Sequence, residues 1–295
     1  MSAYPRGVFS ASLTPLNADL SPDHATLLGH CKHLIAEGCD GIALLGTTGE
    51  ANSFSLDERK AILAAMVEGG IAPGRLLPGT GVCALPETIA LTKHALSLGV
   101  ETVVMLPPFY YKGVSDDGLV AAYSHVIETI GDARLKVVLY HIPPMAQIPI
   151  TFGVVERLLA AYPDTIVGIK DSGGELDHMV KLAQTFPTLS ILAGADPLLL
   201  PLLGQGGAGC ITATSNLVAA ELKTIFLNHA DPEKADLVAA AQAKIVGTRN
   251  KGNSYPQIAT LKAMLAQKSG HDGWRRVRPP HVALDDAQFA ALAAI

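Results

Sequence analysis

The sequence has 295 residues, of which 49% are hydrophobic and 17% charged, and its formal net charge is −5. This composition indicates a well-buried globular chain, either one large domain or one domain with an appendage. The chain has no run of basic residues and no apolar stretch near the roughly 18 residues of a membrane span, so we expect neither a nucleic-acid nor a membrane partner. The amino terminus lacks a signal peptide's hydrophobic segment, and the four cysteines form no CxxC pair. We therefore expect reduced thiols and a cytoplasmic protein.

Short β-rich runs alternate with helical patterns along most of the chain. Strands are predicted at 8–13, 41–45, 76–81, 102–106, 136–142, 166–170, 190–193 and 209–213. Helices are predicted between them at 23–36, 56–68, 86–98, 116–130, 152–160, 175–186, 197–203 and 217–228. Repeated βα units of this kind predict an α/β fold, a (β/α)8 TIM barrel that forms the catalytic domain over residues 1–230. A doubly wound open sheet is the alternative, because periodicity alone does not show that the sheet closes.

The strand patterns stop after Asp231. Helices are predicted at 232–246, 255–267 and 285–294, with loops at 250–254 and 269–280. We interpret residues 231–295 as a helical region packed on the barrel, not as a separate functional domain.

Lys170 ends a run of apolar residues, and a polar, glycine-rich turn follows it at once. A strand that is apolar on both faces is typical of a covered parallel sheet, so the lysine lies at the edge of an apolar interior. Burial disfavours a charged ammonium, and a neutral amine can attack a ketone to form a Schiff base. The alternative is a lysine whose charged end reaches solvent.

Hydroxyl groups follow other strands. The turn Gly46-Thr47-Thr48-Gly49-Glu50 follows the second strand, and its amides and hydroxyls suit a small carboxylate. Tyr110 follows the fourth strand and Tyr140 lies in the fifth. Because the carboxyl ends of barrel strands meet at one rim, these groups and the lysine predict a site for a 2-oxo acid. No carboxylate clearly points into this rim, so we expect a phenol with a hydroxyl relay to move protons.

Four segments in order resemble the dihydrodipicolinate synthase/N-acetylneuraminate lyase family of class I Schiff-base lyases: GTTGE at 46–50, PPFYY at 107–111, YHIPP at 140–144 and GIKDS at 168–172. The resemblance covers the whole chain, including the helical tail. It implies a (β/α)8 barrel, usually a homotetramer built as a dimer of dimers, that acts on pyruvate or a pyruvoyl substrate. We expect no metal and no cofactor.

By position, the resemblance assigns four catalytic residues: Lys170, Tyr140, Thr47 and Tyr110. Lys170 is the expected Schiff-base lysine, Tyr140 the proton shuttle, and Tyr110 the tyrosine that completes the relay of the neighbouring subunit. Five further residues are expected to contact the substrate: Thr48, Ile211, Gly194, Asp196 and Thr214. Thr48 is expected to bind the carboxylate together with Thr47, while the backbone carbonyl of Ile211 is expected near the lysine.

Two departures from the family bear on the substrate. Met145 stands where dihydrodipicolinate synthases carry an arginine for the carboxylate of aspartate semialdehyde, and methionine offers no bidentate fork. The sugar-binding Asp-Glu pair of sialic-acid lyases is matched only as Asp196-Pro197. We therefore expect a 2-keto-3-deoxy sugar acid aldolase or dehydratase. The alternatives are a 4-hydroxy-tetrahydrodipicolinate synthase in which another cation replaces the arginine, and a non-catalytic binding protein of the same fold.

Two further sequence patterns, a glycine-rich turn and a His/Cys cluster on one helix, are interpreted as structural and not as binding sites. Gly79-Thr80-Gly81 resembles a dinucleotide-binding turn, but Glu101 stands before the next strand and not at its end, so we expect no nucleotide. His30, Cys31 and His33 share one predicted helix without a fourth ligand in suitable spacing. We expect these three side chains to be packing and surface residues.

Overall fold

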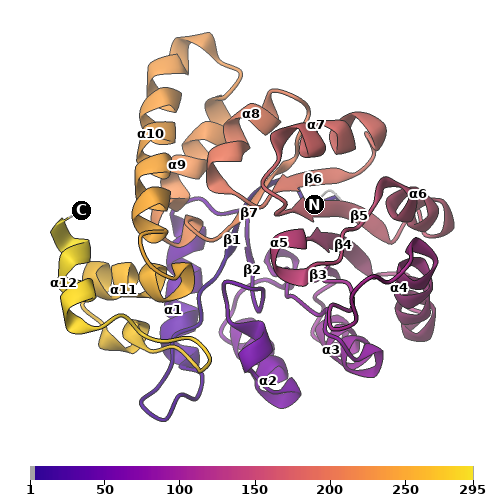
Figure 1. The fold of residues 1–295 in the computed structure, drawn as a ribbon, viewed down its shortest axis with the longest axis horizontal. Helices are drawn as coiled ribbons and strands as arrows, with labels where there is room; N and C mark the ends of the chain where they lie inside the picture. The colour runs from indigo at the N-terminus through magenta and orange to yellow at the C-terminus, as the bar shows by residue number, and fades with distance from the viewer. Residues whose placement is uncertain (1–3, 295) are drawn as a thin grey trace.

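The computed structural model describes residues 4–294. Residues 1–3 of the predicted barrel and residue 295 of the predicted helical region lie outside the described residues. Figure 1 shows the strands gathered at the centre, with helices around them. Seven parallel strands form one sheet in the order β2-β1-β7-β6-β5-β4-β3. Their bounds are β1 Gly7–Ala11, β2 Gly41–Ala43, β3 Thr102–Met105, β4 Lys136–His141, β5 Ile166–Asp171, β6 Ser190–Ala193 and β7 Gly209–Thr212.

An eighth segment joins the two edges of this sheet. Leu76 bridges to Ile42 of β2, and Gly79 bridges to Val104 of β3, both in parallel orientation. The prediction placed a continuous strand at 76–81, whereas the structure pairs this segment through isolated bridges and backbone hydrogen bonds such as Gly79 N–H to the Leu44 carbonyl oxygen at 2.7 Å. Pro78 lies between them and has no N–H to donate, which limits the hydrogen bonding of this segment. The predicted TIM barrel is confirmed, and the open-sheet alternative is wrong.

Helices follow the strands, and those that were predicted cover the outside of the barrel close to their predicted bounds. They are α1 His24–Ala36, α2 Leu56–Glu68, α3 Leu85–Ser97, α4 Asp116–Ile130, α5 Pro143–Ala146, α6 Phe152–Ala161, α7 Leu176–Thr185, α8 Leu199–Leu203 and α9 Ser215–Asn228. Local signals explain the ends: Ser55 and Glu58 form a capping box at the start of α2, and Gly131 ends α4 with a left-handed backbone, φ 62°. The single turn α5 was not predicted. It begins with two prolines directly after β4, where no helical period can develop.

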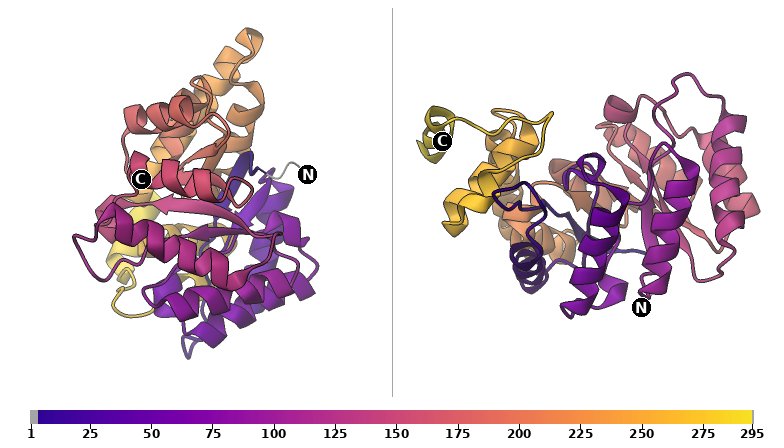
Figure 2. Two further views of the ribbon diagram at one scale, coloured as in Figure 1. Left: turned by 90° about the vertical axis from the view of Figure 1, so that its right-hand side faces the viewer. Right: turned by 90° about the horizontal axis from the view of Figure 1, so that it is seen from below.

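Three more helices follow the barrel: α10 Ala235–Gly252, α11 Gln257–Ser269 and α12 Asp286–Ala294. They lie together on one side, beside α9 and α1 (Figures 1 and 2). Leu261 and Leu265 of α11 share an apolar cluster with Leu13 and Ala213, which follow two barrel strands. The predicted loop at 250–254 is partly wrong, because α10 continues to Gly252. None of the helices within residues 4–294 has the length and apolar character needed to span a membrane.

A buried ion pair ties this helical region to the GTTGE turn. Lys262 of α11 pairs with Glu50, and neither side chain is exposed to solvent. The second carboxylate oxygen of Glu50 accepts a hydrogen bond from the backbone N–H of Arg278 at 3.0 Å. Burial lowers the pKa of Lys262, although the Glu50 carboxylate opposes this shift. The turn that carries Thr47 is therefore held by residues more than 200 positions later in the chain.

Candidate active site

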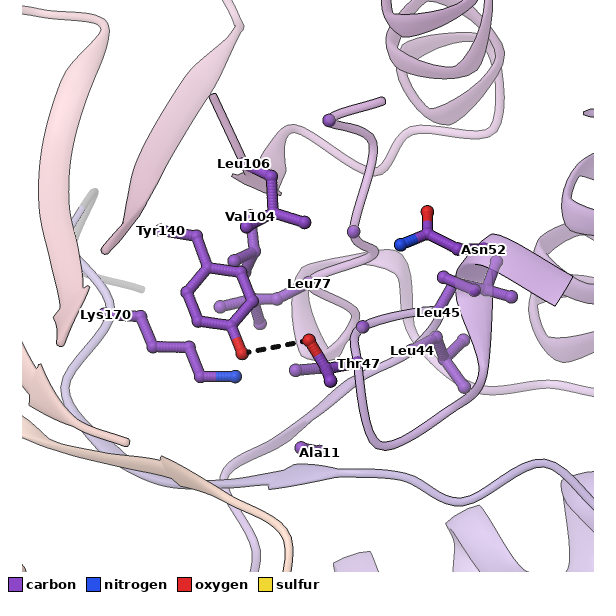
Figure 3. A pocket seen from close by; sticks show the side chains of 15 residues that line it. Ala11, Leu44, Leu45, Thr47, Asn52, Leu77, Val104, Leu106, Tyr140 and Lys170 are labelled. Carbon is purple, nitrogen blue, oxygen red and sulfur yellow. Dashed lines mark hydrogen bonds between the residues drawn. The ribbon is translucent and has the colours of Figure 1, made fainter. Parts of the chain in front are cut away.

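Lys170 and Tyr140 lie side by side at the carboxyl ends of β5 and β4. They are register partners of the two paired strands, so strand pairing itself brings them together. The Lys170 Nζ lies 4.0 Å from the centroid of the Tyr140 ring. Both residues are buried, with 5% and 4% of their surface exposed. Figure 3 shows the amine directed toward the phenolic end of the ring.

Thr47 completes a three-residue group. Its Oγ1 lies 3.3 Å from the phenolic oxygen of Tyr140, and either atom can donate the hydrogen bond (Figure 3). The turn is tightly wound, because Leu45 and Glu50 both have left-handed backbones with φ 57°. A Cβ on Gly49 would lie 2.9 Å from the Ser12 carbonyl oxygen, so the turn packs directly against the strand segment that follows β1.

The environment of Tyr140 favours its ionised form. Burial alone raises the pKa of this phenol. The positive charge of Lys170 and hydrogen bonds from Thr47, Lys170 and Ser172 outweigh burial, and the pKa of Tyr140 is lowered. A phenol with a lowered pKa gives up and regains a proton more readily near neutral pH, as a general acid–base group requires.

Two cavities meet at this group, and four residues line both of them: Ala11, Thr47, Tyr140 and Lys170. The inner cavity, of about 20 Å³, lies among the apolar side chains of the barrel interior. The outer cavity has a volume of about 420 Å³ and lies within the range of about 300–1,000 Å³ typical of small-molecule sites. Three of the predicted substrate contacts line it: Thr48, Gly194 and Ile211.

The remaining predicted site residues lie elsewhere. Asp196 is fully buried, and its Oδ2 accepts a hydrogen bond from Arg249 Nη1 at 2.9 Å. Thr214 is also fully buried, and neither residue lines the outer cavity. A buried carboxylate needs a partner of opposite charge, which explains why Asp196 turns toward an arginine. Direct contact of Asp196 or Thr214 with substrate stays a prediction.

Tyr110 lies outside both cavities of its own chain. It is 73% exposed, and its ring packs edge-to-face against that of Tyr111, with 5.3 Å between the centroids. The two exposed rings follow β3 in the loop before α4. A role of Tyr110 in this site would therefore require a neighbouring subunit.

The outer cavity also has lining residues that sequence reasoning did not single out for the site. Arg249 comes from α10, Gln257 from α11 and His281 from the segment before α12. Met145 lines the same cavity and is 65% exposed. No Asp or Glu within residues 4–294 is among the lining residues. Lys112, the lysine nearest the tyrosine loop, donates to the backbone carbonyl of Ala146 at 2.8 Å and does not line the cavity.

A second polar cluster lies at the carboxyl ends of β4 and β5. His141 and Asp171 directly follow Tyr140 and Lys170, and the Nδ1 of His178 lies 2.6 Å from Asp171 Oδ2. The nearest ligand atoms of these three side chains lie within 4.8 Å of one another. However, His141 Nδ1 accepts a hydrogen bond from the Ile150 N–H at 3.1 Å, so the neutral ring carries its proton on Nε2 and cannot ligate a metal there. The cluster instead fixes the ends of β4 and β5.

The helix with two histidines and a cysteine forms no shared site. His30 Nε2 bonds to Asn216 Oδ1 at 2.9 Å, and the His30 ring packs edge-to-face on Trp274. Cys31 is buried, while His33 is exposed to solvent. The expected packing and surface roles are consistent with this arrangement.

Comparison with known proteins identifies the family of the chain. A model of the dihydrodipicolinate synthetase family matches residues 4–295. The chain belongs to this family. Members of the dihydrodipicolinate synthetase family are lyases, so the resemblance and the lyase class expected from sequence are both confirmed.

Three relatives show how far the similarity extends. An uncharacterized DapA-like lyase from Chloroflexus aurantiacus is 36% identical over 99% of this chain and 96% of its own length. The crystal structure of a dihydrodipicolinate synthase from Agrobacterium tumefaciens superposes with a TM-score of 0.87, at 30% identity and 98% coverage of each chain. A prophage protein of the family from E. coli K12, solved in complex with pyruvate, has a TM-score of 0.88 and 25% identity, covering 98% of this chain and 96% of its own.

Proposed function

We propose that the protein is a class I Schiff-base lyase that acts on pyruvate and on 2-oxo acids derived from it. The observation that carries this proposal is the buried Lys170 amine beside Tyr140, with Thr47 within hydrogen-bond reach of the phenol. The pyruvate complex of the E. coli relative supports the same class of substrate. Three groups in contact at the junction of two cavities are what imine formation needs: a nucleophile, a proton shuttle and a relay partner.

The reaction begins when Lys170 passes a proton to ionised Tyr140 and then attacks the ketone carbon as a free amine. The carbinolamine loses water, with Tyr140 protonating the departing hydroxyl, and a protonated imine is formed. The hydroxyls and backbone amides of Thr47 and Thr48 hold the substrate carboxylate. In aldol cleavage, ionised Tyr140 removes the proton of the C4 hydroxyl, the C3–C4 bond breaks, and its electrons pass into the imine as an enamine. The aldehyde leaves, the enamine is protonated, and water releases pyruvate from Lys170.

The proposed substrate class is a 2-keto-3-deoxy sugar acid, cleaved or dehydrated at this site. Met145 supports this assignment, because its thioether offers no donor for the second carboxylate of aspartate semialdehyde. The competing function is that of a 4-hydroxy-tetrahydrodipicolinate synthase, and the similarity to the Agrobacterium enzyme favours it. Arg249 in the cavity wall is the cation that such an enzyme would use.

Measured kcat/KM values separate the two functions. We expect cleavage or dehydration of 2-keto-3-deoxygluconate to be faster than condensation of pyruvate with aspartate semialdehyde. A tenfold or greater advantage for aspartate semialdehyde would mean that the competing function is correct.

We also propose a cytoplasmic homotetramer, a dimer of dimers. The four cysteines are free thiols, and the exposed pair Tyr110 and Tyr111 offers an apolar surface for a neighbouring subunit. If Tyr110 serves the neighbour's site, a reassembled mixture of Tyr110→Phe and Lys170→Ala chains should recover activity that neither variant has alone. A fully active monomer would contradict this assembly.

A further inference from the structure

The outer cavity has a wall made by the C-terminal helical region. Arg249, Gln257 and His281 line it, and each can donate an N–H hydrogen bond. Other lining side chains, including Ile142, Pro144 and Met145, offer no donor. A substrate longer than pyruvate therefore meets hydrogen-bond donors where it reaches the C-terminal region.

Arg249 is held in place by one hydrogen bond and keeps further N–H groups that can bind a ligand. Its Nη1 donates to the fully buried Asp196 at 2.9 Å, while the arginine side chain itself is 25% exposed. Within residues 4–294, no second acceptor is hydrogen-bonded to this guanidinium. A guanidinium has five N–H groups in a rigid fork, so the pair with Asp196 orients the head and leaves further donors for a ligand.

We propose that Arg249 binds a hydroxyl oxygen of the substrate tail, the part of the 2-oxo acid beyond the bond that is cleaved, and thereby determines specificity for hydroxylated tails. This inference rests on the proposed Schiff-base function and names the feature of the substrate that the cavity selects. The unused N–H groups of Arg249 in the cavity wall are the observation that carries the proposal, because an apolar tail would leave them without partners in a partly buried site.

The charge around Arg249 favours a hydroxyl over a carboxylate. The carboxylate of Asp196 already balances the guanidinium, and it lies in a site that excludes water. A substrate carboxylate on the same guanidinium would bring a second negative charge close to the first in a medium of low dielectric. A hydroxyl accepts the same charge-assisted hydrogen bond without adding charge.

The test compares two substrates that differ only in the tail. One is 2-keto-3-deoxygluconate, and the other is 4-hydroxy-2-oxohexanoate, which keeps the cleaved bond and lacks the tail hydroxyls. In Arg249→Met we expect kcat/KM to fall about 10- to 100-fold for the first substrate, the range for a hydrogen bond to a charged group, and less than about threefold for the second. Borohydride trapping of pyruvate on Lys170 should be unchanged, because the substitution leaves the Lys170 end of the cavity as it is.

Two further variants control for structure. Arg249→Met leaves Asp196 buried without its partner, so Asp196→Asn with Arg249→Met removes both charges and should show the same selective loss if the single variant does not fold. Met145→Leu changes a neighbouring apolar lining residue and should affect both substrates alike.

Equal losses on the two substrates, or no loss on either, would overturn the assignment of Arg249. A higher kcat/KM for pyruvate with aspartate semialdehyde, lost in Arg249→Met, would show that Arg249 binds a carboxylate instead. Failure of the wild-type protein to trap pyruvate would instead overturn the proposed function itself, so the two failures are distinguishable.

Discussion

The outer cavity joins two regions of different origin. At its inner end, Lys170, Tyr140 and Thr47 come from barrel strands and the turn after β2. At the C-terminal wall, Arg249 and Gln257 come from helices that follow the barrel. We propose that the inner end carries the groups for bond making and breaking, while the C-terminal wall offers hydrogen-bond donors beside the apolar Pro256 and Ile258. The proposed chemistry and the proposed substrate choice thus lie on separate parts of the chain.

The two regions are nevertheless physically coupled. The buried pair of Glu50 and Lys262 joins the GTTGE turn to α11. On α1, His30 contacts Asn216 of α9 and Trp274 of the C-terminal region. Substitutions can therefore test whether each region keeps its own role, and whether the contacts between them matter for the site.

The largest effect is expected at the inner end. Tyr140→Phe removes the phenolic oxygen that bonds Thr47, so turnover should fall by about 10² to 10⁴, the range for a lost acid–base group. Steady-state rates and circular dichroism would show whether the loss occurs in a folded protein. Tyr123→Phe is the matched control, because Tyr123 is equally buried but bonds the Met105 carbonyl oxygen away from the outer cavity. Equal rates for Tyr140→Phe and wild type would reassign Tyr140 to packing.

A second prediction concerns the link between the regions. Lys262→Met leaves the fully buried Glu50 carboxylate without its cation, so the free energy of unfolding should fall by about 3–5 kcal/mol. Urea unfolding measures this loss of stability. The KM for pyruvate should also rise, because Thr47 and Thr48 lie in the same turn as Glu50.

The double variant Glu50→Gln with Lys262→Met is the control for this link. With both charges removed it should recover most of the lost stability, since Gln can still accept from the Arg278 N–H. A loss below 1 kcal/mol in the single variant would show that the pair does not hold the turn.

A third prediction concerns pH. Burial lowers the pKa of His30 to about 4, below the unfolded value of about 6.5, although the hydrogen bond to Asn216 opposes the shift. Protonation therefore favours the unfolded state. The contribution of neutral His30 to the free energy of unfolding is complete above pH 6.5 and is lost as the pH falls toward 4. The free energy of unfolding should fall by about 3 kcal/mol over this pH range because of His30. Urea unfolding at several pH values should show a shallower decline in His30→Gln than in wild type.

The control lies on the same helix, where the exposed His33 adds a smaller repulsion that also lowers the pKa of His30, so His33→Gln should change the pH dependence less than His30→Gln does. An identical decline in wild type and His30→Gln would contradict the role of His30.

Most of the barrel and its inner end were predictable because the signals are local. Lys170 and Tyr140 each end an apolar run, and Thr47 lies in a glycine-flanked turn, so short segments place all three at strand ends. The segment 76–81 was harder, because Pro78 interrupts the hydrogen bonding that its β-rich residues suggest. The turn α5 was missed because a single helical turn has no period to detect.

Arg249 shows why the C-terminal wall was not predicted. It lies in a helix with many polar residues, and its position in the cavity depends on how α10 packs against the turn that carries Asp196. Asp196 was singled out from the sequence, but its partner 53 residues later was not. Such pairs between distant segments arise from tertiary packing, and neither hydrophobic periodicity nor a turn motif predicts them.

Covalent trapping with borohydride tests whether Lys170 is the nucleophile. The protein is incubated with pyruvate and sodium borohydride, digested, and the modified lysine is located by mass spectrometry. Lys262 is the internal control, because it is also fully buried but paired with Glu50. We expect one reduced pyruvate adduct per chain, on Lys170, with loss of activity and no adduct on Lys262. An adduct confined to another residue, or full activity after treatment with no adduct, would contradict it.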